Sequence, residues 1–168
     1  MTPSSPTPAD RRRPDASSVV FADHDPGSSA VAVAVTAYFA ELERRFPAGF
    51  DGGAPDDGDD FRPPNGCFVL ATDHGEPIAC GAVRTIDDGI GEIKRMWVHE
   101  DWRGAGLGSR MLRELEARSA RLGHRVARLD TSSTLGEAIA MYERAGYRRV
   151  DRYNDNPYAE LFFEKRLP

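Results

Sequence analysis

Cysteine, lysine and long apolar runs are all scarce in this chain of 168 residues. No apolar stretch reaches the roughly 18 residues that a membrane-spanning helix needs, so we expect no transmembrane segment and no membrane partner. No apolar segment follows the first basic residues, which argues against a secretory signal. Lysine occurs only at Lys94 and Lys165, so arginine supplies most of the 22 basic residues.

Positive charge is also in deficit, because 27 acidic residues give the chain a formal charge of −5. Nucleic-acid-binding proteins usually carry a basic face, so we expect no nucleic-acid partner. Two cysteines, Cys67 and Cys80, cannot build a disulfide framework and lack CxxC spacing, which indicates reduced thiols and a cytoplasmic location. Four scattered histidines share no ligand spacing, so no metal site is predicted. They are His24, His74, His99 and His124.

The length and composition fit a single globular domain preceded by a tail. Residues 1–18 contain four prolines, several hydroxyl side chains and an arginine run from Arg11 to Arg13. Such a segment has little apolar surface to bury, so we expect it to be disordered. Residues 19–168 are therefore expected to form the folded domain.

Hydrophobic spacing predicts helices and strands in both halves of the chain. A short strand at 19–21 and a capped helix at 29–46 are followed by a long loop at 47–66 that has no means of packing. Three strands in succession, separated by turns, then suggest an antiparallel meander. The pattern next changes to strand, glycine-rich turn, helix and strand over 90–130, which is typical of a βαβ unit. The strands are expected at 67–72, 77–86, 90–99, 125–130, 148–153 and 160–165, and two further helices from 107 to 122 and from 136 to 145. The turn at 25–28 is expected to cap the first helix, and the segment 73–76 to form a hairpin turn. Gly123 is the expected stop of the second helix, and Ser109 is a candidate for its cap.

The glycine-rich turn between the third strand and its helix is the most informative motif. It reads Arg103-Gly104-Ala105-Gly106-Leu107-Gly108. Glycine lets the backbone approach a ligand closely, and the first N–H groups of a helix lack partners within the helix. The helix dipole makes the same end positive, so the turn is suited to bind phosphate.

Three phosphate ligands compete for this turn. A dinucleotide fingerprint requires GxGxxG in an alternating β/α chain, whereas here the glycines fall at every second position after a strand meander. A P-loop requires a lysine directly after its last glycine, and Gly108 is followed by Ser109. The pyrophosphate of coenzyme A is the third ligand.

Two segments resemble the GNAT superfamily of acyl-CoA-dependent N-acyltransferases. The segment 92–109 resembles the family's motif A, in which Arg103, Gly106 and Gly108 fill the [RQ]-x-x-G-x-[GA] pattern. The segment 137–147 resembles motif B, with Tyr142 at its tyrosine position. Both motifs occur in order on the expected elements. The resemblance implies the GNAT fold, an α/β (α+β) arrangement with a mixed, mostly antiparallel central sheet flanked by helices.

The resemblance also implies acetyl-CoA as co-substrate, held where the strands 90–99 and 125–130 separate. One position departs from the family: Leu135 stands where relatives often carry an asparagine that binds the pantetheine arm, so that contact is left unassigned between a backbone group, Ser132 and Ser133. The residues that the resemblance assigns to the cofactor are Met96, Trp97, Val98, Arg103, Gly104, Ala105, Gly106, Leu107, Gly108 and Ser109.

Direct acyl transfer to an amine needs a base, because only a neutral amine attacks the thioester. By resemblance, Glu92 is the candidate base, directly or through water. The alternative is a surface glutamate paired with Lys94 or Arg95. Tyr142 is the candidate donor to the departing sulfur, and its alternative role is a buried aromatic residue on a helix stripe.

In this family the acceptor pocket is usually bounded by the first helix with its following loop and by the last hairpin. The residues assigned to substrate on this basis are Tyr38, Phe39, Arg45, Arg152 and Tyr153. We expect N-acetylation of a small or amino-acid-like amine. Acetylation of a protein lysine or N-terminus, and a non-catalytic acyl-CoA-binding sensor, remain alternatives. Dimers are common among relatives, so a homodimer is left open.

Overall fold

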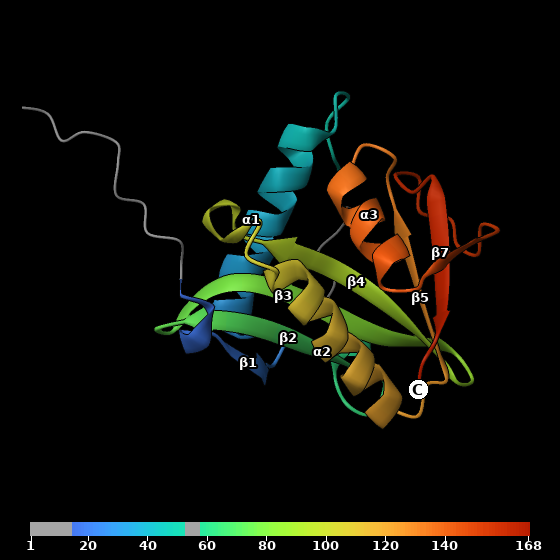
Figure 1. Cartoon of the computed structure of the whole chain (residues 1–168), viewed down its shortest axis with the longest axis horizontal. Coiled ribbons are helices and arrows are strands. Elements are labelled where there is room, and N and C mark those ends of the chain that lie inside the picture. The colour runs from blue at the N-terminus through green and yellow to red at the C-terminus, as the bar shows by residue number, and fades with distance from the viewer. Residues whose placement is uncertain (1–14, 53–57) are drawn as a thin grey trace, which may run out of the picture.

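A seven-stranded sheet forms the centre of the computed structural model, which describes residues 15–52 and 58–168 (Figure 1). The strand order is β1-β2-β3-β4-β5-β7-β6. The β4–β5 pair is parallel and the other five neighbouring pairs are antiparallel, which confirms the mixed, mostly antiparallel sheet. The strands are β1 (Val20–Asp23), β2 (Gly66–Asp73), β3 (Glu76–Asp87), β4 (Ile90–Val98), β5 (Val126–Thr131), β6 (Arg148–Val150) and β7 (Leu161–Arg166).

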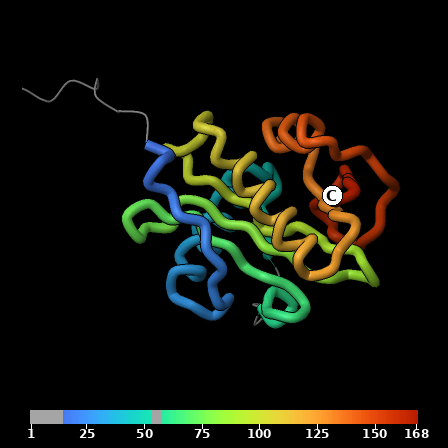
Figure 2. Tube along the Cα trace, turned by 60° about the horizontal axis from the view of Figure 1, so that its bottom comes forward, coloured from blue at the N-terminus to red at the C-terminus, as the bar shows by residue number. Residues whose placement is uncertain are grey.

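Three α-helices cover the two faces of this sheet. The helices α2 (Leu107–Arg121) and α3 (Gly136–Arg144) lie on one face, and α1 (Ser29–Arg45) lies on the other (Figures 1 and 2). Each face has its own hydrophobic cluster. Among the described residues, no helix combines the length and apolar character needed to cross a membrane.

The strand β2 is buried on both faces, and this explains its unbroken apolar sequence. Cys67, Val69 and Ala71 face the α2 cluster, whereas Phe68 and Leu70 face the α1 cluster. Successive side chains of a strand point to opposite faces, so a strand between two helical layers must be apolar at every position.

The predicted turns and helix ends are confirmed. Ser28 caps α1 by accepting the Val31 N–H. His74 and Gly75 both have positive φ in the β2–β3 hairpin, at 47° and 85°. This is the backbone that a two-residue hairpin turn requires, because its twist matches that of the strands. Gly123, with φ of 94°, follows the end of α2 as its predicted stop.

Residues 15–18, which the sequence assigns to the tail, have a defined conformation in the structure. A 3₁₀ turn, η1, spans Ala16–Ser18, and Asp15 caps it. The Ser18 hydroxyl donates to the Asp73 carboxylate at 2.5 Å, so the tether to β2 comes from a side-chain contact that composition does not reveal. The rest of the predicted tail, residues 1–14, lies outside the described residues.

The prediction that the loop at 47–66 has no means of packing is wrong for its described residues, and residues 53–57 lie outside them. The 3₁₀ turn η2 (Asp59–Phe61) buries the Phe61 ring to 3% exposure. That ring meets Phe68 edge-on, with centroids 6.2 Å apart, and the Arg95 guanidinium lies 5.0 Å from its centroid. One aromatic side chain therefore anchors a segment whose average composition is that of a loop.

The strand β6 is shorter than the predicted 148–153, because its last pair joins Val150 to Phe162. The Arg152 side chain then donates to main-chain carbonyls of the following loop, including those of Asn154 and Ala159. These bonds fold the loop instead of extending the strand.

Candidate active site

The parallel strands β4 and β5 separate soon after they begin. Their pairing runs from Ile90 opposite Val126 to Glu92 opposite Arg128 and does not continue. Beyond this point the two strands present unpaired edges to a shared opening. This is the separation at which the sequence resemblance placed the cofactor.

An irregularity in β4 bends the strand next to the opening. Between the Cys80–Trp97 and Ala82–Lys94 pairs, β4 has one residue more than β3. Arg95 lies in this bulge with φ of 56°, an uncommon conformation for a residue other than glycine. A bulge adds local twist, so it turns the end of β4 away from its neighbour.

A cavity of about 1200 Å³ lies over the opening. Its walls come from α1, β4, the start of α2, the end of β5, α3 and the loop before β7. The residues assigned to the cofactor meet here, and Ala105 is the one of them that does not line the cavity. Those that do are Met96, Trp97, Val98, Arg103, Gly104, Gly106, Leu107, Gly108 and Ser109.

The N-terminus of α2 faces the cavity without a side-chain cap. Gly106 is the N-cap residue with φ of 78°, and Gly104 has φ of 79°. A Cβ at either glycine would meet no atom within 4 Å, so the backbone borders open space. Ser109 is therefore not the cap. A Cβ at Gly108 would lie 3.2 Å from the sulfur of Met141, so this glycine serves the packing of α2 on α3.

The Arg103 guanidinium is engaged within the protein. It donates to the Val98 carbonyl at 3.2 Å and pairs with Glu41 at 2.5 Å. Glu41 also pairs with Arg45 at 3.0 Å, and Arg45 reaches Glu137 at 3.4 Å. This chain of ion pairs joins α1 to the β4–α2 turn and to α3. The backbone of the turn thus borders the cavity, and the Arg103 side chain is directed to α1.

Tyr142 lies in the cavity wall, where the sequence resemblance required it. It is 7% exposed, and its hydroxyl lies 4.0 Å from the Met96 sulfur. Burial, and then the negative charge of Asp130, raise the pKa of Tyr142 above its ordinary value. The phenol therefore keeps its proton at neutral pH and can donate it.

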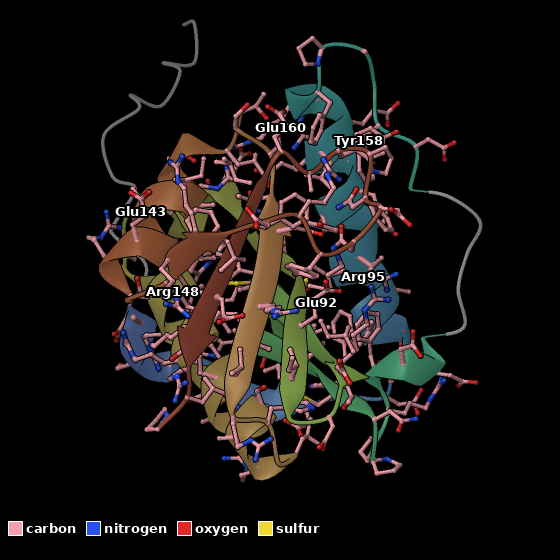
Figure 3. The ribbon with its side chains drawn as sticks, turned by 90° about the vertical axis from the view of Figure 1, so that its right-hand side faces the viewer. Glu92, Arg95, Glu143, Arg148, Tyr158 and Glu160 are labelled. Carbon is pink, nitrogen blue, oxygen red and sulfur yellow. The ribbon has the colours of Figure 1, made fainter. Side chains whose placement is uncertain are left out.

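Glu92 is buried on β4 beside β5, and its side chain is 1% exposed (Figure 3). Its carboxylate pairs with Arg84 at 2.8 Å, accepts a hydrogen bond from Asn154 at 3.2 Å and lies 3.7 Å from Lys94. Glu92 is not among the described residues that line the cavity. The Glu92 carboxylate therefore does not lie at the surface, and it does not border the cavity in which an acceptor would bind.

Asp130, at the end of β5, supplies a carboxylate to the cavity that the sequence argument missed. Its side chain is 7% exposed and pairs with Lys94 at 3.1 Å. It also accepts hydrogen bonds from Asn154 at 2.6 Å and Asn156 at 3.3 Å. Its charge acts on the Tyr142 hydroxyl, so the two groups share one region of the cavity. Its position at the carboxyl end of a parallel strand was the available signal.

The residues expected to bind the acceptor divide into two groups. Tyr38, Phe39 and Arg45 line the cavity. Arg152 and Tyr153 are not among its described lining residues: Arg152 binds the loop carbonyls, and Tyr153 packs on the ring of Phe162. The loop contributes residues 156–159 in their place.

Aromatic rings gather in the part of the cavity wall formed by α1, the segment after it and the loop before β7, which we call the acceptor end. Phe39 stacks on Phe50 with centroids 5.8 Å apart, and Phe50 lies 4.6 Å from Tyr158. Phe46 contacts both Phe50 and Tyr158, at 5.7 and 5.3 Å. Tyr158 lies beside α1, apart from Glu92 (Figure 3). The contribution of Phe50 was not foreseen, because it belongs to the loop thought unable to pack.

The described residues contain no group of three His, Cys, Asp or Glu side chains that could hold a metal ion. Cys67 and Cys80 are buried free thiols. Burial raises the pKa of Cys67 to about 11 and that of Cys80 to about 12. Both are therefore protonated and poor nucleophiles.

Comparisons with known proteins identify relatives of the chain. It is 32% identical over 105 residues to an uncharacterised N-acetyltransferase of Schizosaccharomyces pombe, covering 61% of this chain and 64% of that protein. It is 33% identical over 105 residues to an IAA acetyltransferase of Azospirillum brasilense, covering 60% of this chain and 67% of that protein. The chain thus spans about two thirds of the length of these curated relatives.

Solved structures share the fold. A candidate acyl-CoA N-acyltransferase of Klebsiella pneumoniae is 27% identical, with a TM-score of 0.72 over 89% of this chain and 97% of that one. An Elizabethkingia anophelis GNAT acetyltransferase with acetyl-CoA bound is 15% identical, with a TM-score of 0.63 over 89% and 99%. The family model for acetyltransferase (GNAT) matches residues 35–147, which is more than half of the sequence. With its fold, its separated strands and both motifs in place, the chain belongs to the acetyltransferase (GNAT) family.

Proposed function

We propose that this protein transfers the acetyl group of acetyl-CoA directly to a primary amine of a small molecule. One observation carries the proposal. The uncapped N-terminus of α2 and the protonated phenol of Tyr142 open onto the same cavity, where β4 and β5 separate. The name of the A. brasilense relative, an IAA acetyltransferase, supports a small-molecule acceptor.

The cofactor end of the cavity fits acetyl-CoA. Phosphate groups suit the backbone at Gly104 and Gly106, because open space and the positive end of a helix coincide there. The pantetheine arm suits the opening between β4 and β5, whose edges offer unpaired backbone groups. Leu135 lines the cavity, so that position offers apolar contact instead of an amide side chain.

The acceptor must lose a proton before it attacks. An alkylamine with a pKa near 10 costs about 4 kcal/mol to deprotonate at pH 7. The amine nitrogen then bonds to the thioester carbonyl carbon, and the carbon–sulfur bond breaks. In our proposal Tyr142 gives its proton to the departing sulfur and regains one of the two protons that the ammonium group loses, while the other proton leaves through Asp130. Glu92 acts behind it as a positioning residue, because Asn154 donates to both carboxylates.

The acceptor end favours a small molecule over a segment of another protein. The main-chain N–H of Asp51 donates to the Tyr158 hydroxyl at 2.8 Å. This bond joins the segment after α1 to the loop before β7. A peptide lysine would need that end of the cavity to be open.

Titration calorimetry with acetyl-CoA, NAD and ATP is the first test. We expect binding of acetyl-CoA and none of the controls. Thiol release with a panel of amines and peptides then identifies the acceptor class. Faster turnover of peptides than of small amines would contradict the small-molecule acceptor. Binding without release for any amine would instead indicate an acyl-CoA sensor.

A further inference from the structure

We infer that the acceptor is an arylalkylamine, a primary amine joined by a short chain to an aromatic ring, with no carboxylate beside the amine. The inference deepens the proposed function and rests on it. Three features of the cavity support it: a wall of aromatic rings, a carboxylate in the same cavity, and the pairing of Arg45 and Lys94 with carboxylates.

The aromatic wall consists of Phe39, Phe46, Phe50 and Tyr158. All four side chains are partly exposed and line the cavity, and their rings contact one another. They come from α1, the segment after it and the loop before β7. Aromatic rings attract another ring through apolar burial and through edge-to-face or offset contacts. The wall therefore fits a flat apolar group better than a polyamine or a sugar.

The carboxylate of Asp130 lines the same cavity as this wall. Asn156 links it to the backbone of the loop that carries Tyr158: the Asn156 side-chain N–H donates to Asp130 at 3.3 Å, and its side-chain oxygen accepts the main-chain N–H of Tyr158 at 3.1 Å. In our inference the substrate places its ring against the wall and its ammonium group at Asp130. Asp130 also acts on the Tyr142 hydroxyl, so the amine would sit near the proposed proton donor.

The charges around the acceptor end disfavour a carboxylate on the substrate. Arg45 is paired with Glu41 and Glu137. Lys94 is paired with Asp130. An α-carboxylate beside the amine would stand against the Asp130 carboxylate, and repulsion between like charges rejects such a ligand.

The Arg95 guanidinium is a further basic group of the cavity lining. It lies 5.7 Å from the Phe39 ring centroid and 5.0 Å from that of Phe61. A guanidinium over ring faces is stabilised by the rings. We therefore assign Arg95 to support of the wall.

The test compares three primary amines: 2-phenylethylamine, n-butylamine, which lacks the ring, and phenylalanine, which adds the carboxylate. Thiol release from acetyl-CoA gives kcat/KM for each. We expect 2-phenylethylamine to exceed both others by about tenfold or more, because a buried ring contributes that much binding. Equal or faster turnover of n-butylamine or phenylalanine would overturn the inference while leaving the proposed acetyl transfer intact.

Calorimetry with the same amines, in the presence and absence of coenzyme A, measures their binding and so tests the inference independently of turnover. Tighter binding of 2-phenylethylamine without thiol release would support the inference and contradict the proposed function. Binding of none of the three, with acetyl-CoA bound normally, would overturn the inference. Failure to bind acetyl-CoA would overturn the proposed function, and the order of amine binding would still decide the acceptor class.

Two matched variants test whether the aromatic wall causes the preference for 2-phenylethylamine. Phe50→Leu removes a ring from the wall, and we expect the ratio of kcat/KM for 2-phenylethylamine over n-butylamine to fall at least threefold. Phe21→Leu makes the same change on β1, where the ring lies under Arg110 and does not line the cavity. That control should keep the ratio. A ratio unchanged in Phe50→Leu, with the fold intact by circular dichroism, would overturn the assignment of the wall.

Discussion

Tyr142 has a buried hydroxyl in the cavity wall, and burial raises its pKa, so the phenol is protonated over the whole working range of pH. We expect Tyr142→Phe to lower kcat about a hundredfold, because general acid catalysis is typically worth that much or more. The ring remains, so the Kd for acetyl-CoA should change little. Thiol release and calorimetry measure the two effects separately.

Tyr147→Phe is the matched control for that variant. Its ring lies against Tyr142, with centroids 6.0 Å apart, but Tyr147 does not line the cavity. Removal of its hydroxyl should leave kcat close to that of the native protein. An equal loss of kcat in both variants would assign the effect to packing.

The pH dependence of turnover follows from the same residue. Burial raises the pKa of Tyr142, so the acid form persists as the pH increases. The alkylamine must lose its proton, so kcat/KM should increase from pH 6 to about 9, with no decline below the ordinary tyrosine pKa of about 10. A descending limb centred below pH 9 in the pH–rate profile would contradict Tyr142 as the donor.

At the scale of elements, the N-terminus of α2 is the feature on which cofactor binding depends. Gly106→Val should abolish binding of acetyl-CoA, since the side chain enters the open space that the phosphates need. A branched residue at a φ of 78° is also strained, by roughly 1–2 kcal/mol. Calorimetry measures the binding, and chemical denaturation measures the strain.

The variant Gly123→Val separates the loss of acetyl-CoA binding from the backbone strain. Gly123 follows the other end of α2, has φ of 94°, and a Cβ there also meets no atom within 4 Å. The strain should be similar in both variants, whereas acetyl-CoA binding should persist in Gly123→Val. Normal affinity in Gly106→Val would refute the phosphate site.

The other end of α2 is fastened to the sheet by His124. Its two ring nitrogens lie 2.8 Å from the hydroxyls of Ser119 and Thr85, and it is 5% exposed. We expect His124→Asn to lower the free energy of unfolding by about 1–3 kcal/mol, because the shorter side chain leaves the buried Ser119 hydroxyl without its partner. His74→Asn, at a side chain that is 85% exposed, should change it by less than about 0.5 kcal/mol.

The same histidine makes stability depend on pH. Burial lowers the pKa of His124, so the unfolded chain binds this proton more readily than the folded one. Its stabilising effect is present above the unfolded pKa of about 6.5 and is lost as the pH falls below that value. Urea denaturation at pH 7.5 and 5 should show a smaller pH effect in His124→Asn than in the native protein.

At the scale of the whole molecule, the proposed cofactor site draws on α2, β4, β5 and α3 together. A ligand that binds only the folded chain at 100 times its Kd stabilises it by about 2.7 kcal/mol. For a domain of this size that corresponds to an increase in Tm of roughly 5–10 °C. Thermal denaturation with acetyl-CoA should show this shift, and NAD and ATP should not. No shift at saturating acetyl-CoA would contradict the site.

The sequence by itself determined the local features and the family. Apolar spacing marked the helices, Ser28 and Gly123 marked helix ends, and the glycines before α2 marked a phosphate turn. These signals are local, because caps, turns and amphipathic stripes depend on residues a few positions apart. The motifs around Gly106 and Tyr142 were sufficient for the GNAT family, since they lie within continuous segments.

The tertiary structure alone decided which side chains meet. Glu92 and Asp130 are both acidic residues on adjacent strands, but cross-strand pairing buries Glu92 against Arg84, whereas Asp130 lies where β5 has separated from β4. The aromatic wall likewise joins Phe50 to Tyr158, which are far apart in sequence. Such contacts depend on strand order, bulges and loop closure, and no short-range pattern encodes them.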